Sequence, residues 1–215
     1  MDPIVTFLFT DVVESTQLWE RYPADMRRIL MRHNTLLTGI VRARNGRVFK
    51  TMGDACCAVF AHPTDALLAA LDGQRALLEQ DWGAVGALPV RMALHTGPAE
   101  KMRNDYLGLS LHHTDRLLKI GDGGQILLSE ATSRLVESCL PAQTALIDLG
   151  AFRLKGLQRQ HRIFALRHPA LPLDRAEPRW DALRLDGLLS ARFPRESARA
   201  DLVAAERHLS AGDYQ

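Results

Sequence analysis

Apolar positions change their spacing several times along residues 1–168, and these changes predict the order of the strands and helices. Short apolar runs bounded by turn residues predict strands at 4–10, 47–50, 55–61, 89–96, 125–129, 145–154 and 162–166. Apolar residues at helical spacing predict helices at 24–44, 63–78, 109–120 and 130–138. Strands and helices mixed in this order predict an α+β fold in which helices cover a mixed or antiparallel sheet.

Turn and cap residues add detail to this pattern. Residues 47–61 are expected to form a β-hairpin with a tight connection at 51–54. Ser15 and Thr16 are expected to cap a short helix that ends before the next proline. The polar residues 100–105 are expected to form a loop.

The character of the chain changes after residue 168. Residues 1–168 are predicted to form the compact domain, and the proline-rich residues 169–194 are predicted to form a linker. Residues 195–215 form a second amphipathic segment, a C-terminal helical appendage that is similar to the opening of a helical repeat. A single helix of this kind cannot bury its apolar face alone, so we expect it to pack on the domain or on a protein partner.

The overall composition is typical of a globular protein. The chain has 215 residues, of which 47% are apolar and 24% are charged, and its formal net charge is +2. A charge this small does not favour a nucleic-acid partner. No window of about 18 apolar residues occurs, so we expect a soluble, cytoplasmic chain that makes no contact with a membrane. Cys56, Cys57 and Cys139 are too few for a disulfide framework and are expected to stay reduced, with the adjacent pair on opposite faces of a strand.

Three segments carry side chains that are suited to chemistry. Asp11 ends an apolar strand, and Asp54 follows Gly53 in the tight connection of the hairpin. Two carboxylates at adjacent strand ends are suited to a Mg²⁺ ion shared with substrate phosphates, and glycine allows a positive φ or the close approach of a ligand. His112 and Arg116 lie four residues apart in a predicted helix and share one face. Taken one at a time, these features also fit a helix cap, a turn and a solvated helix face.

Six segments, taken together in their order and spacing, resemble the class III adenylate/guanylate cyclase catalytic domain. They are FLFTDVVEST, GRVFKTMGDACCAVF, VRMALHTGPAE, DYLGLSLHHTDRLL, GGQILLSEAT and FRLKGL, and the resemblance covers residues 3–166. It implies a ferredoxin-like α+β domain that works as a head-to-tail homodimer with active sites shared across the interface. It also implies that a nucleoside triphosphate is closed to a 3′,5′-cyclic monophosphate with release of pyrophosphate, with two Mg²⁺ or Mn²⁺ ions in each site.

The resemblance further implies roles for individual residues. Asp11 and Asp54 resemble the metal-binding aspartates, with the backbone carbonyl of Val12 as a third ligand. Lys50 and Asp105 resemble the pair that reads the purine edge in adenylate cyclases. A lysine can donate to N1 of adenine and a carboxylate can accept from the exocyclic amine, so ATP is the expected substrate.

Three more residues are similar to positions of the phosphate and ribose site. Arg116 resembles the arginine that stabilises charge on the transferred phosphoryl group, and Lys155 resembles the lysine that grips the terminal phosphates. His112 stands where the family usually has an asparagine that orients the ribose, and Glu14 stands where the family usually has a glycine.

Two alternatives to an adenylate cyclase stay open. The altered position His112 leaves room for a cyclase of the pyrimidine nucleotides UTP or CTP, although the pair Lys50 and Asp105 argues against it. The other alternative is a degenerate, non-catalytic module that binds nucleotide or dimerises. The two aspartates Asp11 and Asp54 argue against this module, because a pure scaffold has no need to keep two like charges together.

Overall fold

The computed structural model describes residues 2–171. The predicted linker at 169–194 and the predicted amphipathic segment at 195–215 therefore lie almost wholly outside the described residues. The strands are Ile4–Val12 (β1), Arg47–Met52 (β2), Ala55–Phe60 (β3), Val90–Pro98 (β4), Glu100–Met102 (β5), Asp105–Leu107 (β6), Ile126–Ser129 (β7), Ala145–Arg153 (β8) and Gln160–Arg167 (β9). The helices are Ser15–Arg21 (α1), Pro23–Ala43 (α2), Pro63–Glu79 (α3), Leu109–Ile120 (α4) and Glu130–Val136 (α5), with short 3₁₀ turns at Gly83–Val85 and Glu137–Cys139.

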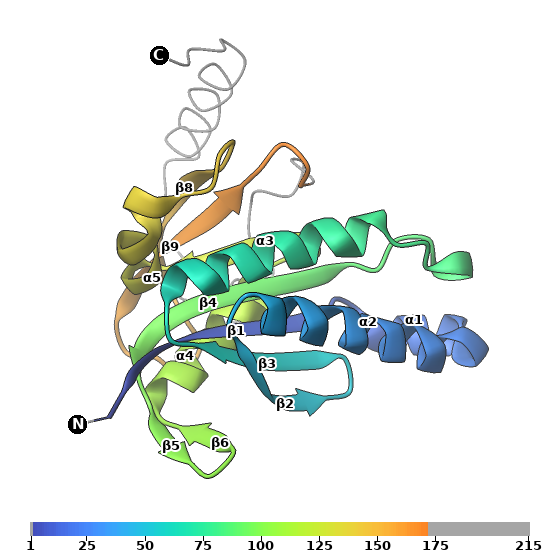
Figure 1. Ribbon diagram of the computed structural model, residues 1–215, viewed down its shortest axis with the longest axis horizontal. Coiled ribbons are helices and arrows are strands. Elements are labelled where there is room, and N and C mark those ends of the chain that lie inside the picture. The colour runs from blue at the N-terminus through green and yellow to red at the C-terminus, as the bar shows by residue number, and fades with distance from the viewer. Residues whose placement is uncertain (1, 172–215) are drawn as a thin grey trace.

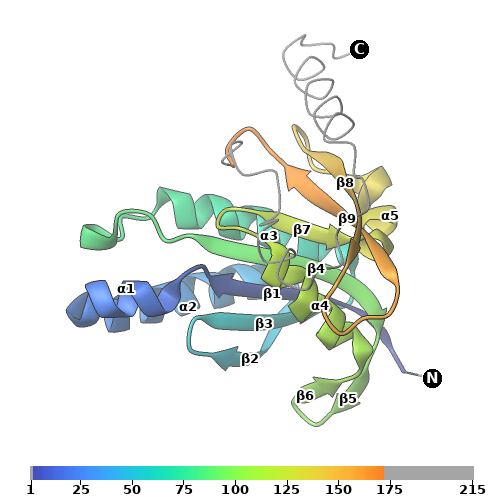
Figure 2. The ribbon, with the colours of Figure 1, turned by 180° about the vertical axis from the view of Figure 1, so that it is seen from behind.

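Seven of the strands form one sheet in the order β2-β3-β1-β4-β7-β9-β8. Strand β1 pairs antiparallel with β3 on one side and with β4 on the other, and β4 pairs parallel with β7. Helices α2 and α3 cover one face of this sheet, and α4 covers the other (Figures 1 and 2). The result is the α+β fold with a mainly antiparallel, helix-covered sheet that the order of elements predicts.

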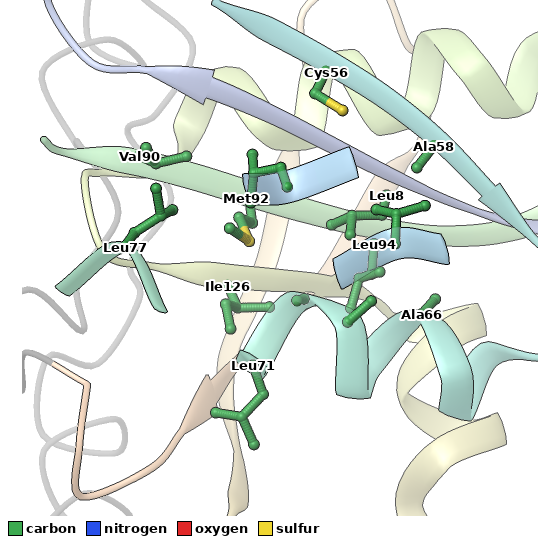
Figure 3. Packing of buried hydrophobic residues seen from close by; sticks show 14 of the residues in the cluster. Leu8, Cys56, Ala58, Ala66, Leu71, Leu77, Val90, Met92, Leu94 and Ile126 are labelled. Carbon is green, nitrogen blue, oxygen red and sulfur yellow. The ribbon is translucent and has the colours of Figure 1, made fainter. Parts of the chain in front are cut away.

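Strand β1 is apolar on both faces because both faces are covered. Leu8 and Val12 point to the layer of α2 and α3, whereas Phe7 and Phe9 point to the layer of α4. On the first face, side chains of β1, β3, β4 and β7 meet those of α3 (Figure 3). Full burial of one leucine or phenylalanine side chain contributes about 1.5–3 kcal/mol, so this two-sided strand is a main source of the stability of the domain.

The cysteines have the positions that the strand period predicts. Cys56 and Cys57 are buried in β3 and belong to the two opposite hydrophobic layers. Burial raises the pKa of the Cys56 thiol to about 12 and that of Cys57 to about 11, so both stay protonated at neutral pH. Both cysteines, and the exposed Cys139, are free thiols.

Two local predictions are wrong. Residues 100–105 are not a loop, because β5 and β6 pair as a separate two-stranded hairpin that projects from the main sheet (Figure 1). Its strands are too short to show an alternating pattern, and Arg103 has a left-handed φ of 49 where a glycine would have indicated a turn. Ser15 is already helical, so Glu14 is the N-terminal cap residue, and no side chain caps the helix.

None of the helices in the range 2–171 has the length and apolar character needed to cross a membrane.

Three histidine rings form a cluster where α4 meets the sheet, with His95 and His113 stacked and His161 edge-on to His113. The His113 ring of α4 lies 4.1 Å from the ring of His95 in β4 and 4.4 Å from the ring of His161 in β9, between centroids. His95 Nδ1 also lies 2.8 Å from the Ser129 hydroxyl oxygen. Burial lowers the pKa of His95 to about 3 and that of His113 to about 4, and it lowers the pKa of His161 as well. The histidine cluster is therefore uncharged at neutral pH.

This histidine cluster predicts that acid destabilises the domain. The unfolded chain takes up protons on these histidines from about pH 6.5 downwards, whereas the folded pKa values are lower, so the free energy of unfolding falls with pH. His113→Leu keeps an apolar side chain at this position but removes one titrating group. Between pH 6.5 and pH 5, the free energy of unfolding should therefore fall by about 1 kcal/mol less in this variant than in the wild type, after allowance for partial exposure. Urea unfolding at a series of pH values measures this. The exposed His62 supplies the control His62→Gln, and equal slopes in the two variants would contradict the prediction.

Candidate active site

The Asp11 carboxylate lies near the end of the central strand, directly across from Arg91 of β4. Arg91 donates to Asp11 Oδ2 from Nε at 3.1 Å and from Nη2 at 2.5 Å, and Lys119 Nζ donates to the same oxygen at 3.1 Å. The side chains of Asp11 and Arg91 are each only 13% exposed. A carboxylate so far from water requires compensating charge, and these two cations supply it.

The Asp54 carboxylate lies beside the same strand end. Gly53 before it has a φ of 62, a left-handed conformation that glycine adopts without strain. The turn brings Asp54 Oδ2 to 3.1 Å from the backbone N–H of Val12, which donates to it. The structure therefore brings Asp54 to Val12 at the end of β1, next to Asp11, although Asp54 is distant from both in the sequence.

These donors fit a hard divalent cation such as Mg²⁺ or Mn²⁺. Such ions prefer carboxylate and carbonyl oxygens, and Mg²⁺ is usually held by one or two carboxylates together with substrate phosphates. All three cation contacts of Asp11 are made to Oδ2, so Oδ1 carries no hydrogen bond within the described part of the chain. One oxygen of Asp11 and one of Asp54 thus make no hydrogen bond within residues 2–171.

Lys50 and Asp105 form a second charged pair on a different pair of elements. Lys50 Nζ of β2 lies 3.3 Å from Asp105 Oδ2 of β6, and both side chains are nearly half exposed. The other carboxylate oxygen of Asp105 accepts from the backbone N–H of Tyr106 at 2.8 Å. This N–H first, and Lys50 as a further cause, lower the pKa of Asp105. The pair presents an ionised acceptor beside a cationic donor at the surface.

The remaining predicted site residues lie on α4 and in the turn between β8 and β9. His112 is exposed on α4, and Arg116 one turn later is half-exposed, with Nη1 3.5 Å from the carboxylate of Asp115. Lys155 is exposed in the turn between β8 and β9. Across residues 2–171, no hydrogen bond or ion pair connects His112, Arg116 or Lys155 to the two groups described above.

Arg91 and Lys119 are the charged partners that reasoning from the sequence missed. Arg91 is a charged residue within a strand that is otherwise almost fully buried. A charge in such a position requires an opposite charge, and Asp11 is a candidate from another apolar strand. This signal indicates that a pair exists. The register that aligns the two strands is what identifies the partner.

Glu14 occupies a backbone conformation that favours glycine. Its φ of 58 and ψ of 33 lie in the left-handed region, immediately before α1. A side chain there costs on the order of 1 kcal/mol, since the β-carbon approaches the following carbonyl. The glycine that the cyclase resemblance implies at this position therefore has a physical reason, and this chain carries a strained residue beside Asp11 and Val12.

Comparison with known proteins adds a decisive observation. Residues 2–168 match the family model of the adenylate and guanylate cyclase catalytic domain. The chain belongs to this family. An uncharacterised protein of Mycobacterium tuberculosis is 36% identical to the cyclase domain over 167 residues, which cover 77% of this chain and 56% of that protein. An adenylate cyclase of Podospora anserina is 30% identical over 224 residues, which cover 78% of this chain and 10% of that protein. The chain spans about half the length of the first relative and a small part of the second.

Solved structures share the fold of this cyclase domain. Adenylate cyclases from Trypanosoma brucei in their monomeric state match with a TM-score of 0.72 at 24% identity, over 82% of this chain and 94% of that chain. An adenylyl cyclase from Pseudomonas aeruginosa matches with a TM-score of 0.68 at 22% identity, over 78% of this chain and 95% of that chain. The predicted cyclase fold is thereby confirmed.

The buried pair of Asp11 and Arg91 predicts a measurable coupling in the cyclase domain. Arg91→Leu should lower the free energy of unfolding by about 2–3 kcal/mol, because it leaves a buried carboxylate with Lys119 as its remaining cation. Asp11→Asn in the same chain should restore at least about 1 kcal/mol. Lys119→Ala is the control and should cost less than about 1 kcal/mol, because Lys119 is half exposed. Urea unfolding measures each variant, and additive effects of Arg91→Leu and Asp11→Asn would contradict the coupling.

Proposed function

We propose that this cyclase domain converts ATP into 3′,5′-cyclic AMP and pyrophosphate, in active sites shared between two copies of the chain. The observation that carries the proposal is the contact of 3.3 Å between Lys50 and Asp105, a donor and an acceptor side by side at the surface. The second support is the pair of carboxylates, Asp11 and Asp54, at one strand end.

The pair of Lys50 and Asp105 matches the hydrogen-bonding edge of adenine. Lys50 would donate to N1, and Asp105 would accept from the exocyclic amine. Guanine presents a donor at N1 and an acceptor at its exocyclic oxygen. Its donor would face the donor Lys50, and its acceptor would face the acceptor Asp105. A site that leaves such groups unpaired discriminates strongly between substrates, and this favours ATP over GTP.

The metal site would be formed by Asp11 and Asp54, together with the carbonyl oxygen of Val12. Two Mg²⁺ or Mn²⁺ ions held there would supply positive charge to the oxygens that enter and leave in the reaction. Arg91 and Lys119 now neutralise Asp11. When a metal cation shares that carboxylate, their charge becomes available to the triphosphate of the nucleotide.

The other predicted residues would act on the nucleotide itself. The ribose 3′ hydroxyl would lose its proton to water, its oxygen would attack the α-phosphorus, the bond from that phosphorus to the oxygen bridging to the β-phosphate would break, and pyrophosphate would leave. Arg116 would bind the phosphoryl oxygens through its forked guanidinium, and Lys155 would bind the terminal phosphates. His112 would orient the ribose by one hydrogen bond from its ring. Catalysis of this kind depends on positioning and on charge stabilisation.

The lack of direct contacts between these residues in the described part of one copy supports a site shared between two copies. Within the described residues, Arg116 forms an ion pair with Asp115, and no hydrogen bond or ion pair joins it to Asp11, Asp54 or Lys50. A head-to-tail homodimer would bring the Lys50 and Asp105 pair of one copy to the carboxylates of the other. Exposed apolar side chains on the projecting hairpin and the start of α4, among them Leu107 and Leu109, are suited to contact with a second copy.

Product analysis tests the reaction. We expect the protein with Mn²⁺ or Mg²⁺ to form cyclic AMP from ATP with a kcat/KM at least tenfold above those for GTP, CTP and UTP. Asp54→Asn should lower the rate by a factor of 100 or more, because a metal ligand loses its charge. The matched control is Asp25→Asn, which alters an exposed ion pair on α2 and should leave the rate unchanged.

Other outcomes of this experiment would contradict the proposal. A preference for UTP or CTP would favour a pyrimidine nucleotide cyclase. Absence of any cyclic product from folded, metal-supplied protein would favour a module that binds nucleotide without catalysis.

Complementation tests the shared site. Lys50→Ala and Asp54→Ala are each expected to be inactive as homodimers, since each removes one part of both sites. A mixture should recover activity, because a heterodimer keeps one intact site with Lys50 from one copy and Asp54 from the other. After equal mixing and full subunit exchange, about half of the dimers would be heterodimers, and each heterodimer would have one intact site out of two. About a quarter of the wild-type activity is therefore expected. No recovery, with exchange shown by mass spectrometry, would refute the shared site.

A further inference from the structure

A β-bulge in β2 decides which side chains share the face of Lys50. Along β2, Arg47 pairs with Val59, Val48 pairs with Ala58 and Lys50 pairs with Cys57, so one extra residue, Phe49, is inserted between the last two pairs. Val59 and Cys57 belong to the same hydrophobic layer, and Ala58 belongs to the opposite one. In a regular strand, positions 47 and 50 would face opposite sides. The bulge puts Arg47 and Lys50 on the same side, the side of β6.

Arg47 contacts both neighbours of Asp105. Its Nη1 donates to the backbone carbonyl oxygen of Asn104 at 3.3 Å. Its guanidinium carbon lies 5.6 Å from the centroid of the Tyr106 ring, within the range of a cation–π interaction. One side chain of β2 therefore holds β6 immediately before and immediately after Asp105.

The hairpin of β5 and β6 requires such side-chain contacts. It is a two-stranded sheet of three-residue strands outside the seven-stranded sheet, and isolated hairpins of this size are marginally stable. Tyr106 gives the hairpin an apolar contact, since its ring lies 5.5 Å from that of Phe7 and 5.3 Å from that of Phe49. Arg47 gives it a polar contact from the same strand that carries Lys50.

The orientation of Asp105 depends on this arrangement. The Tyr106 N–H donates to one carboxylate oxygen at 2.8 Å, and Lys50 donates to the other at 3.3 Å. The first bond fixes the carboxylate relative to the backbone of β6. The second exists only while that backbone stays at its present distance from β2.

We propose that Arg47 is a positioning residue for base selection, which holds β6 on both sides of Asp105 so that this carboxylate lies opposite Lys50. The inference rests on the proposed function, since base selection presupposes that the pair reads adenine. It extends that function to a residue that need not touch the nucleotide.

Kinetics with two nucleotides provide the first test. Arg47→Gln should lower the ratio of kcat/KM for ATP over GTP by about threefold to tenfold, with most of the change in the KM for ATP. Arg47→Lys keeps the positive charge above the Tyr106 ring but loses the planar guanidinium group. Its ratio of kcat/KM for ATP over GTP should therefore lie between those of Arg47→Gln and the wild type. The control Arg27→Gln changes an exposed arginine on α2 and should leave the ratio unchanged. An equal loss of kcat for both nucleotides, or an unchanged ratio in Arg47→Gln, would overturn the proposal.

A second measurement does not depend on catalysis. Lys50→Gln should raise the pKa of Asp105, because it removes a cationic donor. NMR of the Asp105 carboxyl carbon over a pH titration measures this pKa. The same substitution in an Arg47→Gln chain should raise the Asp105 pKa by less, because the contact with Lys50 is already weakened. An equal rise in both backgrounds would overturn the positioning role. If the wild-type protein cyclises no nucleotide, the proposed function fails. The comparison of the Asp105 pKa in the single and double variants still decides whether Arg47 positions Asp105.

Discussion

Strand β1 lies in the middle of the sheet, with an antiparallel neighbour on each edge and a layer of helices on each face. Its side chains are buried in alternate directions, so its register relative to both neighbours is strongly specified, because a slip by one residue would exchange the two hydrophobic layers. The same register puts Asp11 opposite Arg91 and brings the last residue of β1 to the turn that carries Asp54. The geometry of the carboxylate site is thus a consequence of core packing.

The charge of Asp11 is compensated before any ligand arrives. This carboxylate is largely buried, and Arg91 and Lys119 reduce the cost of its burial. Both cations contact the same oxygen, Oδ2. In the proposed reaction a nucleotide with its metal ions would bring charges of both signs, so the site could exchange one set of ion pairs for another without leaving a buried charge uncompensated.

The distance between Lys50 and Asp105 depends on side chains. Lys50 lies on an edge strand of the main sheet, whereas Asp105 lies on a hairpin outside it, so the two residues belong to different sheets. Side chains therefore set their distance: the aromatic contacts of Tyr106 on one side and the guanidinium of Arg47 on the other. Small changes at these side chains can alter recognition of a base while the core of the domain is unchanged.

The sequence alone determined the order of the main elements and the α+β class, and it singled out Asp11, Asp54, Lys50 and Asp105 as candidates, because apolar spacing, turn residues and ordered motifs are local properties of the chain. Tertiary structure decided the rest. The contacts of Arg91 and Lys119 with Asp11 depend on strand register and on the packing of α4. The β5–β6 hairpin has strands too short for a periodic signal. The bulge at Phe49 is visible only when β2 is paired with β3. These features arise from contacts between residues distant in sequence, and local patterns carry no information on which distant residues meet.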